Sequence, residues 1–417
     1  MEKKSYGEAS CRIAVVIPAI MRDGISKQVL CQIKGLMEAR IKVKLIVISD
    51  CNHEVLAELC PGFSTEDMLL LNQPVSYLSR RALLTSLSVV LTVSKFLKRY
   101  NITTVLAHAP YAHFIMRMVK LEAVSLSSFN FKLIQYFHIT QYKEYPLNSL
   151  QRVAINTINQ VLAKRYDDAH VSVSNAVMND IELNLIRHKN HRVIYNALPA
   201  ANCEQPAKTN EAGSRSSFNI LLPGRLEVTK GHFLFLEALK ILVQQQHIAT
   251  ESLHLNIVGE GSEKINILRQ ITDSNLHSYV TVSDAVANLA LMRYMGEADL
   301  VVVPSLHEGL PLVILEALQM GSLILASDID PIKEVITDME TGILFRAGNV
   351  EDCLQKLLYL YQNRASVAVN RAKVDNRLLV KFSFQQHIKQ LLQIIREFSG
   401  HTCVIEAQLN PNDCEAD

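Results

Sequence analysis

The sequence predicts an α/β protein of two domains. Its 417 residues exceed the length that one hydrophobic core usually organises, so two domains of about 200 residues each are expected. Two stretches show the order of elements found in parallel sheets. Residues 299–321 combine a short β-branched run, a loop and a helix, and residues 12–48 indicate strand, helix and strand.

The stretch DLVVVPSLHEGLPLVILEALQMG, residues 299–321, contains the first candidate site. Its apolar run, Leu300 to Val303, is too short for a helix and is typical of a buried parallel strand. Pro304 ends the strand, and Pro311 fits the first position of a helix that Gly321 closes. The free N–H groups of that helix would face the carboxyl end of the sheet, where a phosphate can be held without a metal.

Two carboxylates bracket this position. Glu308 lies in the loop, and Glu316 lies about a turn and a half into the helix, with its side chain tilted back toward the helix start. A nucleotide sugar suits such a site, since it offers a diphosphate to the amides and ribose and sugar hydroxyls to the two acids. The alternative is a surface helix with two solvated glutamates.

At these residues the sequence resembles a known family. The segment HEGLPLVILEAL resembles the Glu, seven residues, Glu motif of the retaining glycosyltransferases of family 4, which have the GT-B fold. The resemblance extends over nearly all of residues 10–400. It implies two Rossmann-like doubly wound domains facing a central cleft. The implied parts are an acceptor-binding domain (1–200), a linker (201–217), a nucleotide-sugar-binding domain (218–381), a helix crossing back to the first domain (382–400) and a tail (401–417).

The resemblance also implies roles for residues of the 299–321 stretch. Glu308 would accept hydrogen bonds from the donor sugar, and Glu316 would bind ribose. The amides of Gly309 and Leu310 would hold phosphate.

A second motif, PGRLEVTKG at residues 223–231, resembles the family's Arg, four residues, Lys pattern. Arg225 and Lys230 would then neutralise the leaving diphosphate. Fixed cations in a dry cleft can stabilise developing phosphate charge in place of Mg²⁺. The alternative makes both residues ordinary surface cations.

Four further residues match family positions less closely. Gly24 resembles a glycine-bearing loop beside the sugar diphosphate, although the family often has two adjacent glycines there. His138 follows a predicted strand at a place where the family positions a histidine near the transferred sugar; the alternative is a structural histidine. Gly259 belongs to a glycine-acid-glycine turn near the nucleotide base, and Val282 lies in the base-contacting strand. Ser283 replaces a common glycine, which leaves the base open.

Composition predicts a soluble cytosolic protein. The chain is 49% hydrophobic and 20% charged, and no stretch reaches the eighteen or so apolar residues of a membrane span. The N-terminal residues lack the long apolar region of a signal peptide. Eight cysteines show no C-x-x-C pair and no metal-ligand spacing, so reduced thiols are expected.

Charge is distributed unequally between the two halves. Residues 1–200 carry 24 Lys and Arg against 15 Asp and Glu, a balance of +9, and residues 201–417 carry 18 against 26, a balance of −8. A basic first half suits an anionic membrane or an acidic acceptor, and the helix predicted at residues 80–100 either lies on a membrane surface or packs under its own sheet. Alternatively, the two halves face each other with complementary fields. Nucleic acid is not the expected partner.

No metal or cofactor is expected apart from the nucleotide-diphosphate sugar that serves as donor. Asp328-Ile329-Asp330 spells the D-x-D of metal-dependent sugar transferases, but in the family this loop binds no metal and runs toward an acid such as Glu334.

The resemblance therefore implies a retaining, metal-independent glycosyltransferase that moves a hexose-type sugar to a glycan or lipid-linked acceptor. Assembly of surface polysaccharide or lipopolysaccharide at the cytoplasmic face of the membrane is the expected setting, by analogy of fold. Two other classes stay open: a GT-B-fold sugar-nucleotide epimerase and a catalytically silent partner subunit.

Overall fold

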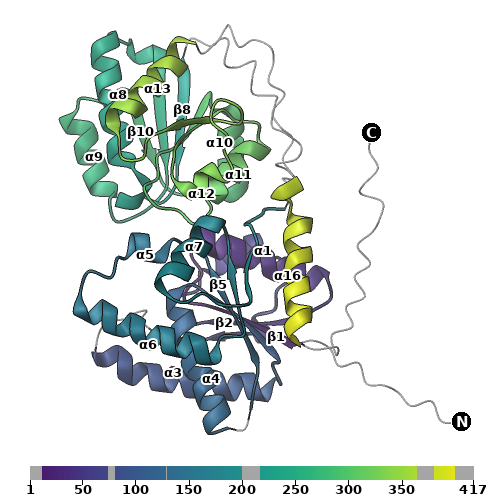
Figure 1. The fold of residues 1–417 in the computed structure, drawn as a ribbon. Coiled ribbons are helices and arrows are strands. Elements are labelled where there is room, and N and C mark those ends of the chain that lie inside the picture. The colour runs from purple at the N-terminus through teal and green to yellow at the C-terminus, as the bar shows by residue number, and fades with distance from the viewer. Residues whose placement is uncertain (1–11, 74–79, 128, 200–216, 364–379, 400–417) are drawn as a thin grey trace, which may run out of the picture.

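Two parallel sheets with helices on both faces make up the protein (Figure 1). The computed structural model describes residues 12–73, 80–127, 129–199, 217–363 and 380–399. The predicted linker, apart from its last residue, and the predicted tail lie outside these ranges. The expected α/β class with two Rossmann-like domains is confirmed, whereas the exact domain limits stay predictions.

The first domain contains a seven-stranded sheet. Its strands are β1 (Arg12–Ile17), β2 (Lys42–Val47), β3 (Met68–Leu70), β4 (Thr104–His108), β5 (Lys132–Phe137), β6 (Ala169–Ser172) and β7 (His191–Val193). Its helices are α1 (Gly24–Glu38), α2 (His53–Leu59), α3 (Arg80–Arg99), α4 (Pro110–Ser125), α5 (Gln141–Glu144), α6 (Leu150–Tyr166) and α7 (Asn175–Asn184). The strand order β3-β2-β1-β4-β5-β6-β7 reverses direction at β1, which is the mark of a doubly wound sheet.

The second domain repeats this plan with six strands. They are β8 (Phe218–Pro223), β9 (Leu253–Val258), β10 (Val280–Ser283), β11 (Leu300–Val303), β12 (Ile324–Ser327) and β13 (Ile343–Phe345), in the order β10-β9-β8-β11-β12-β13. The helices are α8 (His232–Gln246), α9 (Lys264–Asp273), α10 (Asn288–Glu297), α11 (Leu312–Gln319), α12 (Asp330–Lys333) and α13 (Val350–Gln362). A last helix, α16 (Phe384–Ser399), follows.

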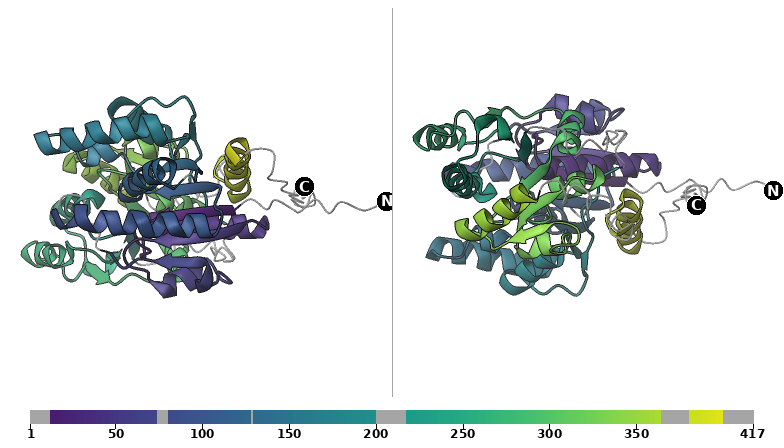
Figure 2. Two further views of the ribbon diagram at one scale, coloured as in Figure 1. Left: turned by 90° about the horizontal axis from the view of Figure 1, so that it is seen from below. Right: turned by 90° about the horizontal axis from the view of Figure 1, so that it is seen from above.

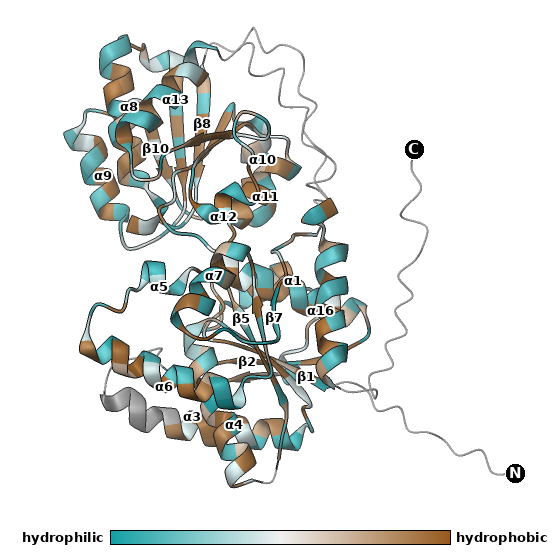
Figure 3. Cartoon of the chain, viewed as in Figure 1, coloured by the Kyte–Doolittle hydropathy of each residue, from teal (hydrophilic) through white to brown (hydrophobic). Residues whose placement is uncertain are grey.

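Hydrophobic residues concentrate in the strands and on the helix sides that face them (Figure 3). In the first domain, α3 and α4 cover one face of the sheet, and α1, α7 and α16 cover the other. The apolar cluster on the second of these faces continues into the second domain through Leu310 and Leu312. The two domains therefore share a core at their junction. Figure 1 shows one domain above the other, and in the views from below and above in Figure 2 one lies in front of the other.

Helix α3 packs against its own sheet over its described part. Val89, Val93 and Leu97 are buried there, whereas Leu87 and Leu91 are exposed. This matches the alternative in which the helix at residues 80–100 packs under its own sheet. Binding of the helix to a membrane surface stays a prediction. No helix in the described ranges has the length and apolar character needed to cross a membrane.

Helix α16 belongs in space to the first domain, although the second domain precedes it in sequence (Figure 1). His387 is buried, and its Nε2 lies 3.1 Å from the side-chain nitrogens of both Gln28 and Gln32 in α1. Its Nδ1 lies 2.6 Å from the carbonyl oxygen of Tyr195. A side chain at Gly35 would collide with Ile388, so α1 and α16 approach closely.

The buried His387 predicts a loss of stability in acid. Burial lowers the pKa of His387 from its ordinary 6.5 to about 4, so below pH 6.5 the unfolded chain binds a proton that the folded protein does not. The stability that the neutral imidazole contributes is complete above pH 6.5. It falls by up to about 1.4 kcal/mol per pH unit as the pH drops toward 4.

We expect His387→Gln to flatten the pH dependence of the melting temperature between about pH 7 and 5, relative to the wild-type chain. His53→Gln, which changes an exposed histidine at the start of α2, is the matched control and should leave the slope unchanged. Equal slopes in both variants would contradict the assignment of the acid-dependent loss of stability to His387.

Candidate functional site

Glu308 lies in the loop between β11 and α11 and is held by two partners. The Nζ of Lys230 lies 2.6 Å from its Oε1, and the Oγ of Ser305 donates a hydrogen bond of 2.7 Å to the same oxygen. The Glu308 side chain is only 10% exposed. The acid and the cation expected from two separate motifs are therefore in direct contact.

The backbone of the Lys230 loop explains this contact. Gly231 has φ 73°, a left-handed conformation that glycine adopts without strain, and a Cβ there would overlap the carbonyl oxygen of Pro304. In addition, the amide of Leu306 donates to the carbonyl of Thr229 over 2.7 Å. The loop after β8 is thus fastened to the loop after β11.

Arg225 behaves differently from Lys230. Its side chain is 48% exposed, and its ion pair in the structure is with Glu227, at 2.7 Å. It lies on the same loop as Lys230. A role on a diphosphate stays a prediction, and it requires the Arg225 side chain to exchange Glu227 for the ligand.

Gly259 and Val282 occupy neighbouring positions at the carboxyl ends of β9 and β10. A Cβ at Gly259 would overlap the carbonyl oxygen of Gly224, and the Gly259 amide donates to Ser283 over 3.0 Å. Val282 is half-buried on the edge strand, paired in register with Ile257. Contact of either residue with a nucleotide base stays a prediction.

The two domains meet at Gly309 and Leu310. A side chain on Gly309 would overlap the carbonyl oxygen of His138, so this close approach requires glycine. The Oγ of Ser174 donates to the Gly309 carbonyl over 2.7 Å, and Nδ2 of Asn196 donates to the Leu310 carbonyl over 3.0 Å. Since His138, Ser174 and Asn196 follow β5, β6 and β7, the carboxyl ends of the two sheets face each other.

Glu316 is buried and ion-paired across this junction with Lys27 of α1, a residue that the sequence did not single out. Lys27 also donates to Oδ1 of Asn288 in the second domain. Gly24, the first residue of α1, lies near Leu312, the first residue of α11. The starts of the two helices therefore face each other. A basic residue one turn into α1 was the available signal for Lys27.

His138 is buried beside His108. Nε2 of His138 lies 2.9 Å from Nδ1 of His108, and the two rings stack with that of Tyr136. Burial, reinforced by the nearby His387, lowers the pKa of His138 to about 3, and burial also lowers that of His108. His138 is consequently neutral near pH 7 and can exchange hydrogen bonds but cannot supply a positive charge.

Each domain supplies a carboxylate to the start of a helix in the other. Glu334 accepts hydrogen bonds from the amides of Asn175, at 3.0 Å, and Ala176, at 2.8 Å, in the first turn of α7. Glu58 of α2 accepts from the amide of Asn288, at 2.9 Å, at the start of α10. A carboxylate at a helix N-terminus is favourable for both hydrogen bonding and the helix dipole. These contacts were not predicted.

The D-x-D acids are engaged in other contacts. Oδ1 of Asp328 accepts from the amide of Ala347 over 2.8 Å, and Asp330 pairs with Lys143 and Lys333 at 3.1 and 3.0 Å. Hydrogen bonds from Lys333 and Lys143 lower the pKa of Asp330. Within the described ranges no group of three or more His, Cys, Asp or Glu residues is placed to hold a metal ion.

Comparison with known proteins finds a family similar to the second domain. Residues 217–363 match the model of the family described as glycosyl transferases group 1. This part of the chain is therefore similar to the glycosyl transferases group 1 family. It contains Arg225, Lys230, Glu308 and Glu316, the four residues that carried the resemblance.

Curated relatives align with parts of this chain. The D-inositol 3-phosphate glycosyltransferase of Paenarthrobacter aurescens (strain TC1) is 32% identical over 149 residues, 35% of this chain and 36% of the relative. The amylovoran biosynthesis glycosyltransferase AmsK of Erwinia amylovora is 28% identical over 242 residues, 53% of this chain and 57% of the relative. The chain thus spans between about a third and somewhat over half of the length of these relatives.

A crystal structure of Anabaena Alr3699/HepE in complex with UDP and glucose resembles the whole two-domain chain. The TM-score is 0.69 with 18% identity, and the match covers 92% of this chain and 99% of that chain. At this identity the likeness concerns the fold. The two domains together therefore have the GT-B architecture.

We expect Gly309→Ala to disturb the domain junction. The added methyl group would overlap the His138 carbonyl, so the loop after β11 must move away from the first domain, at a cost of about 1–3 kcal/mol. The check is the melting temperature together with the radius of gyration by small-angle X-ray scattering. Gly24→Ala is the control, because its Cβ would meet only Leu312 at an ordinary 3.9 Å. Identical behaviour of the two variants would refute the steric argument.

The ion pair between Lys27 and Glu316 yields a second prediction. Lys27→Met leaves a buried carboxylate without its cation, which typically costs about 3–5 kcal/mol, so the melting temperature should fall by roughly 6–12 °C. The double variant Lys27→Met/Glu316→Gln should recover most of that loss. If the double variant is as unstable as the single one, the pair is not the source of the effect.

Proposed function

We propose that this protein is a retaining, metal-independent glycosyltransferase that moves a hexose-type sugar from a nucleotide-diphosphate donor to a glycan or lipid-linked acceptor. The observation that carries the proposal is the contact between Lys230 and Glu308 beside the start of α11, directly against the first domain at His138. A cation for phosphate and a buried acid for sugar hydroxyls are thereby adjacent. The match to the glycosyl transferases group 1 family supports it.

In this proposal Lys230 and Arg225 neutralise the leaving diphosphate, and the amides of Gly309 and Leu310 bind its oxygens. A diphosphate gains negative charge as the glycosidic bond breaks, so donors fixed in advance lower the barrier. Glu308 accepts hydrogen bonds from the donor sugar. Release of Lys230 from Glu308 toward phosphate would couple diphosphate binding to exposure of the acid for the sugar.

Glu316 binds the ribose hydroxyls while it remains paired with Lys27. A carboxylate has two oxygens with about four acceptor positions, so one oxygen can keep the lysine while the other accepts from ribose. Gly24 lies opposite Leu312 at the start of α11, where the absence of a side chain leaves room for a diphosphate or an acceptor. Gly259 and Val282 lie at strand ends where a base would be placed.

The transfer itself would proceed on one face of the donor sugar. The bond from the anomeric carbon to the diphosphate oxygen breaks as the bond to the acceptor oxygen forms, and the acceptor proton passes to the departing phosphate. His138, neutral near pH 7, would hydrogen-bond the transferred sugar or steer the acceptor. The reaction requires neither a covalent nucleophile nor a metal.

The proposed setting is surface polysaccharide or lipopolysaccharide assembly at the cytoplasmic face of the membrane. The name of the relative AmsK, a glycosyltransferase of amylovoran biosynthesis, supports a polysaccharide product. Helix α6 supports peripheral attachment to an anionic bilayer. It exposes Leu150, Val153, Ile158 and Val161, and its last turn carries Lys164 and Arg165.

The test of the proposal is a screen of nucleotide sugars for hydrolysis without acceptor, followed by transfer assays with glycan acceptors. Lys230→Ala, Arg225→Ala and Glu308→Ala should each lower transfer by about 10²–10³-fold while the melting curve stays cooperative. Lys240→Ala, which removes a cation from α8, is the control with unchanged transfer. Near-normal turnover in any of the three variants would contradict the assigned roles.

The same preparation separates the alternatives. An epimerase would isomerise the donor sugar when no acceptor is present, and a silent subunit would bind UDP in calorimetry without turnover. Unchanged transfer in EDTA supports metal independence. Retention is read from the anomeric signal of the product by NMR.

A further inference from the structure

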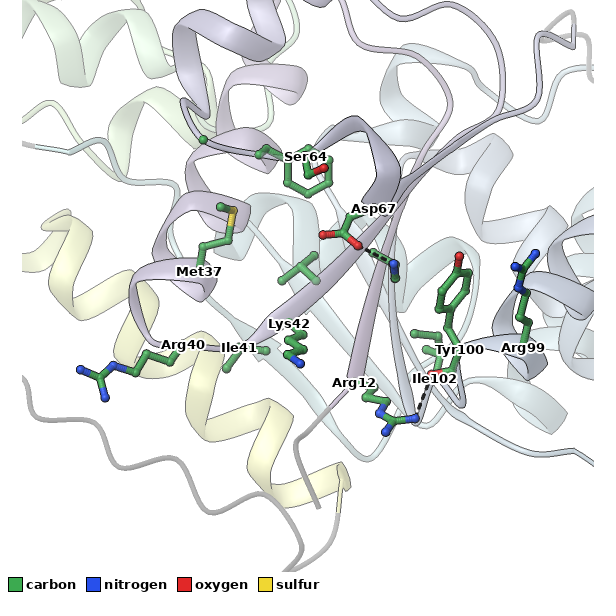
Figure 4. A pocket seen from close by; sticks show the side chains of 14 residues that line it. Arg12, Met37, Arg40, Ile41, Lys42, Ser64, Asp67, Arg99, Tyr100 and Ile102 are labelled. Carbon is green, nitrogen blue, oxygen red and sulfur yellow. Dashed lines mark hydrogen bonds and ion pairs between the residues drawn. The ribbon is translucent and has the colours of Figure 1, made fainter. Parts of the chain in front are cut away.

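A cavity of about 680 Å³ lies in the first domain, at the amino ends of β1 and β2 (Figure 4). Arg12 and Lys42, the first residues of β1 and β2, line it, as do residues at the ends of α1 and α3. In a parallel sheet all the amino ends lie at one edge. The cavity is therefore opposite the carboxyl ends at which Gly24 and His138 meet the second domain.

The lining is strongly basic. It comprises five cations and a single acid, Asp67, with apolar and aromatic side chains between them; the cations are Arg12, Arg40, Lys42, Lys44 and Arg99. The charge of Lys44 already has partners, since Lys44 forms an ion pair with Asp67 and its Nζ lies 3.9 Å from the centre of the Tyr100 ring. The other four have no carboxylate partner among the described residues, so the cavity has an excess of four positive charges.

Arg12 and Lys42 are the most informative of these residues. They are register partners on adjacent parallel strands, which are about 4.8 Å apart, so two cationic side chains start side by side at the amino edge of the sheet. Arg40 follows the end of α1 and Arg99 ends α3, where cations are favourable for the helix dipole whatever the cavity binds. Arg12 and Lys42 begin strands, so the helix dipole does not explain why cations lie there.

The remaining lining indicates the kind of anion. Met37, Ile41, Phe63 and Ile102 provide an apolar wall, and Ser64 provides a hydroxyl. Figure 4 shows Arg12 and Lys42 between Arg40 at one end and Arg99 at the other. Such a row of separated cations along an apolar wall suits an elongated ligand with more than one phosphate charge and an uncharged part.

We propose that this cavity is a second binding site, separate from the domain junction, for a ligand that carries a pyrophosphate or several phosphate groups. Its source is either a free phosphorylated small molecule or the phosphorylated headgroup of a lipid. Phosphates bound between Arg12 and Lys42 neutralise both side chains and form charge-assisted hydrogen bonds with them.

The test uses the full chain and inorganic pyrophosphate in calorimetry. Binding is measured in the Arg225→Ala/Lys230→Ala variant, so that the proposed donor site does not contribute. We expect saturable binding there. Adding Arg12→Gln/Lys42→Gln should weaken it by at least about tenfold, because two charge-assisted contacts are lost.

Adding Lys95→Gln/Lys189→Gln instead is the matched control. It removes two exposed cations of the same domain that do not line the cavity, and it should leave binding unchanged. Absence of pyrophosphate binding, or equal weakening by both pairs of substitutions, would overturn the proposal. Melting temperatures equal to that of the parent protein exclude misfolding as the cause.

A flotation assay distinguishes the two sources. Vesicles of phosphatidylcholine with and without phosphatidic acid are mixed with the wild-type chain and with Arg12→Gln/Lys42→Gln. Binding to the acidic vesicles that depends on Arg12 and Lys42 assigns the cavity to a lipid headgroup. Pyrophosphate binding that depends on these residues, together with vesicle binding that does not, assigns it to a soluble ligand. Sugar transfer, where present, should be unaffected by these substitutions.

Discussion

The approach of Gly309 to the carbonyl of His138 is the constraint on which the arrangement of the two domains depends. It places the loop that carries Glu308 against the carboxyl ends of the strands of the first sheet. The side chains of Ser174 and Asn196 donate hydrogen bonds to the carbonyls of Gly309 and Leu310. The apolar cluster around Leu310 and Leu312 then becomes common to both domains. One residue without a side chain thus sets the separation between two Rossmann-like sheets.

Most of the fold follows from local sequence. The apolar run from Leu300 to Val303 forms a strand with the expected limits, because buried parallel strands are continuous apolar segments. Small shifts have local causes. Gly24, expected in a loop, is the first residue of α1, since the side chain of Asp23 accepts from the Ser26 amide and caps the helix there. Pro311 precedes the helix instead of beginning it.

The candidate site was predictable only within each domain. Lys230 and Glu308 come from recognisable motifs, and the structure brings them together. The partners across the junction, such as Lys27 for Glu316 and Glu334 for α7, are separated from their targets by more than 150 residues, and no local pattern reports a contact of that kind. The ion pair of Arg225 with Glu227 also depends on a side-chain conformation that the motif does not specify.

The exchange of acids between the domains has a consequence for how the molecule opens. Glu334 closes the start of a helix in the first domain, and Glu58 does the same in the second, so a rigid rotation of one lobe breaks both sets of bonds together. Closure should therefore be an all-or-none change in which both sets of hydrogen bonds form or break together. A ligand that binds between the domains need only shift this equilibrium toward the closed state.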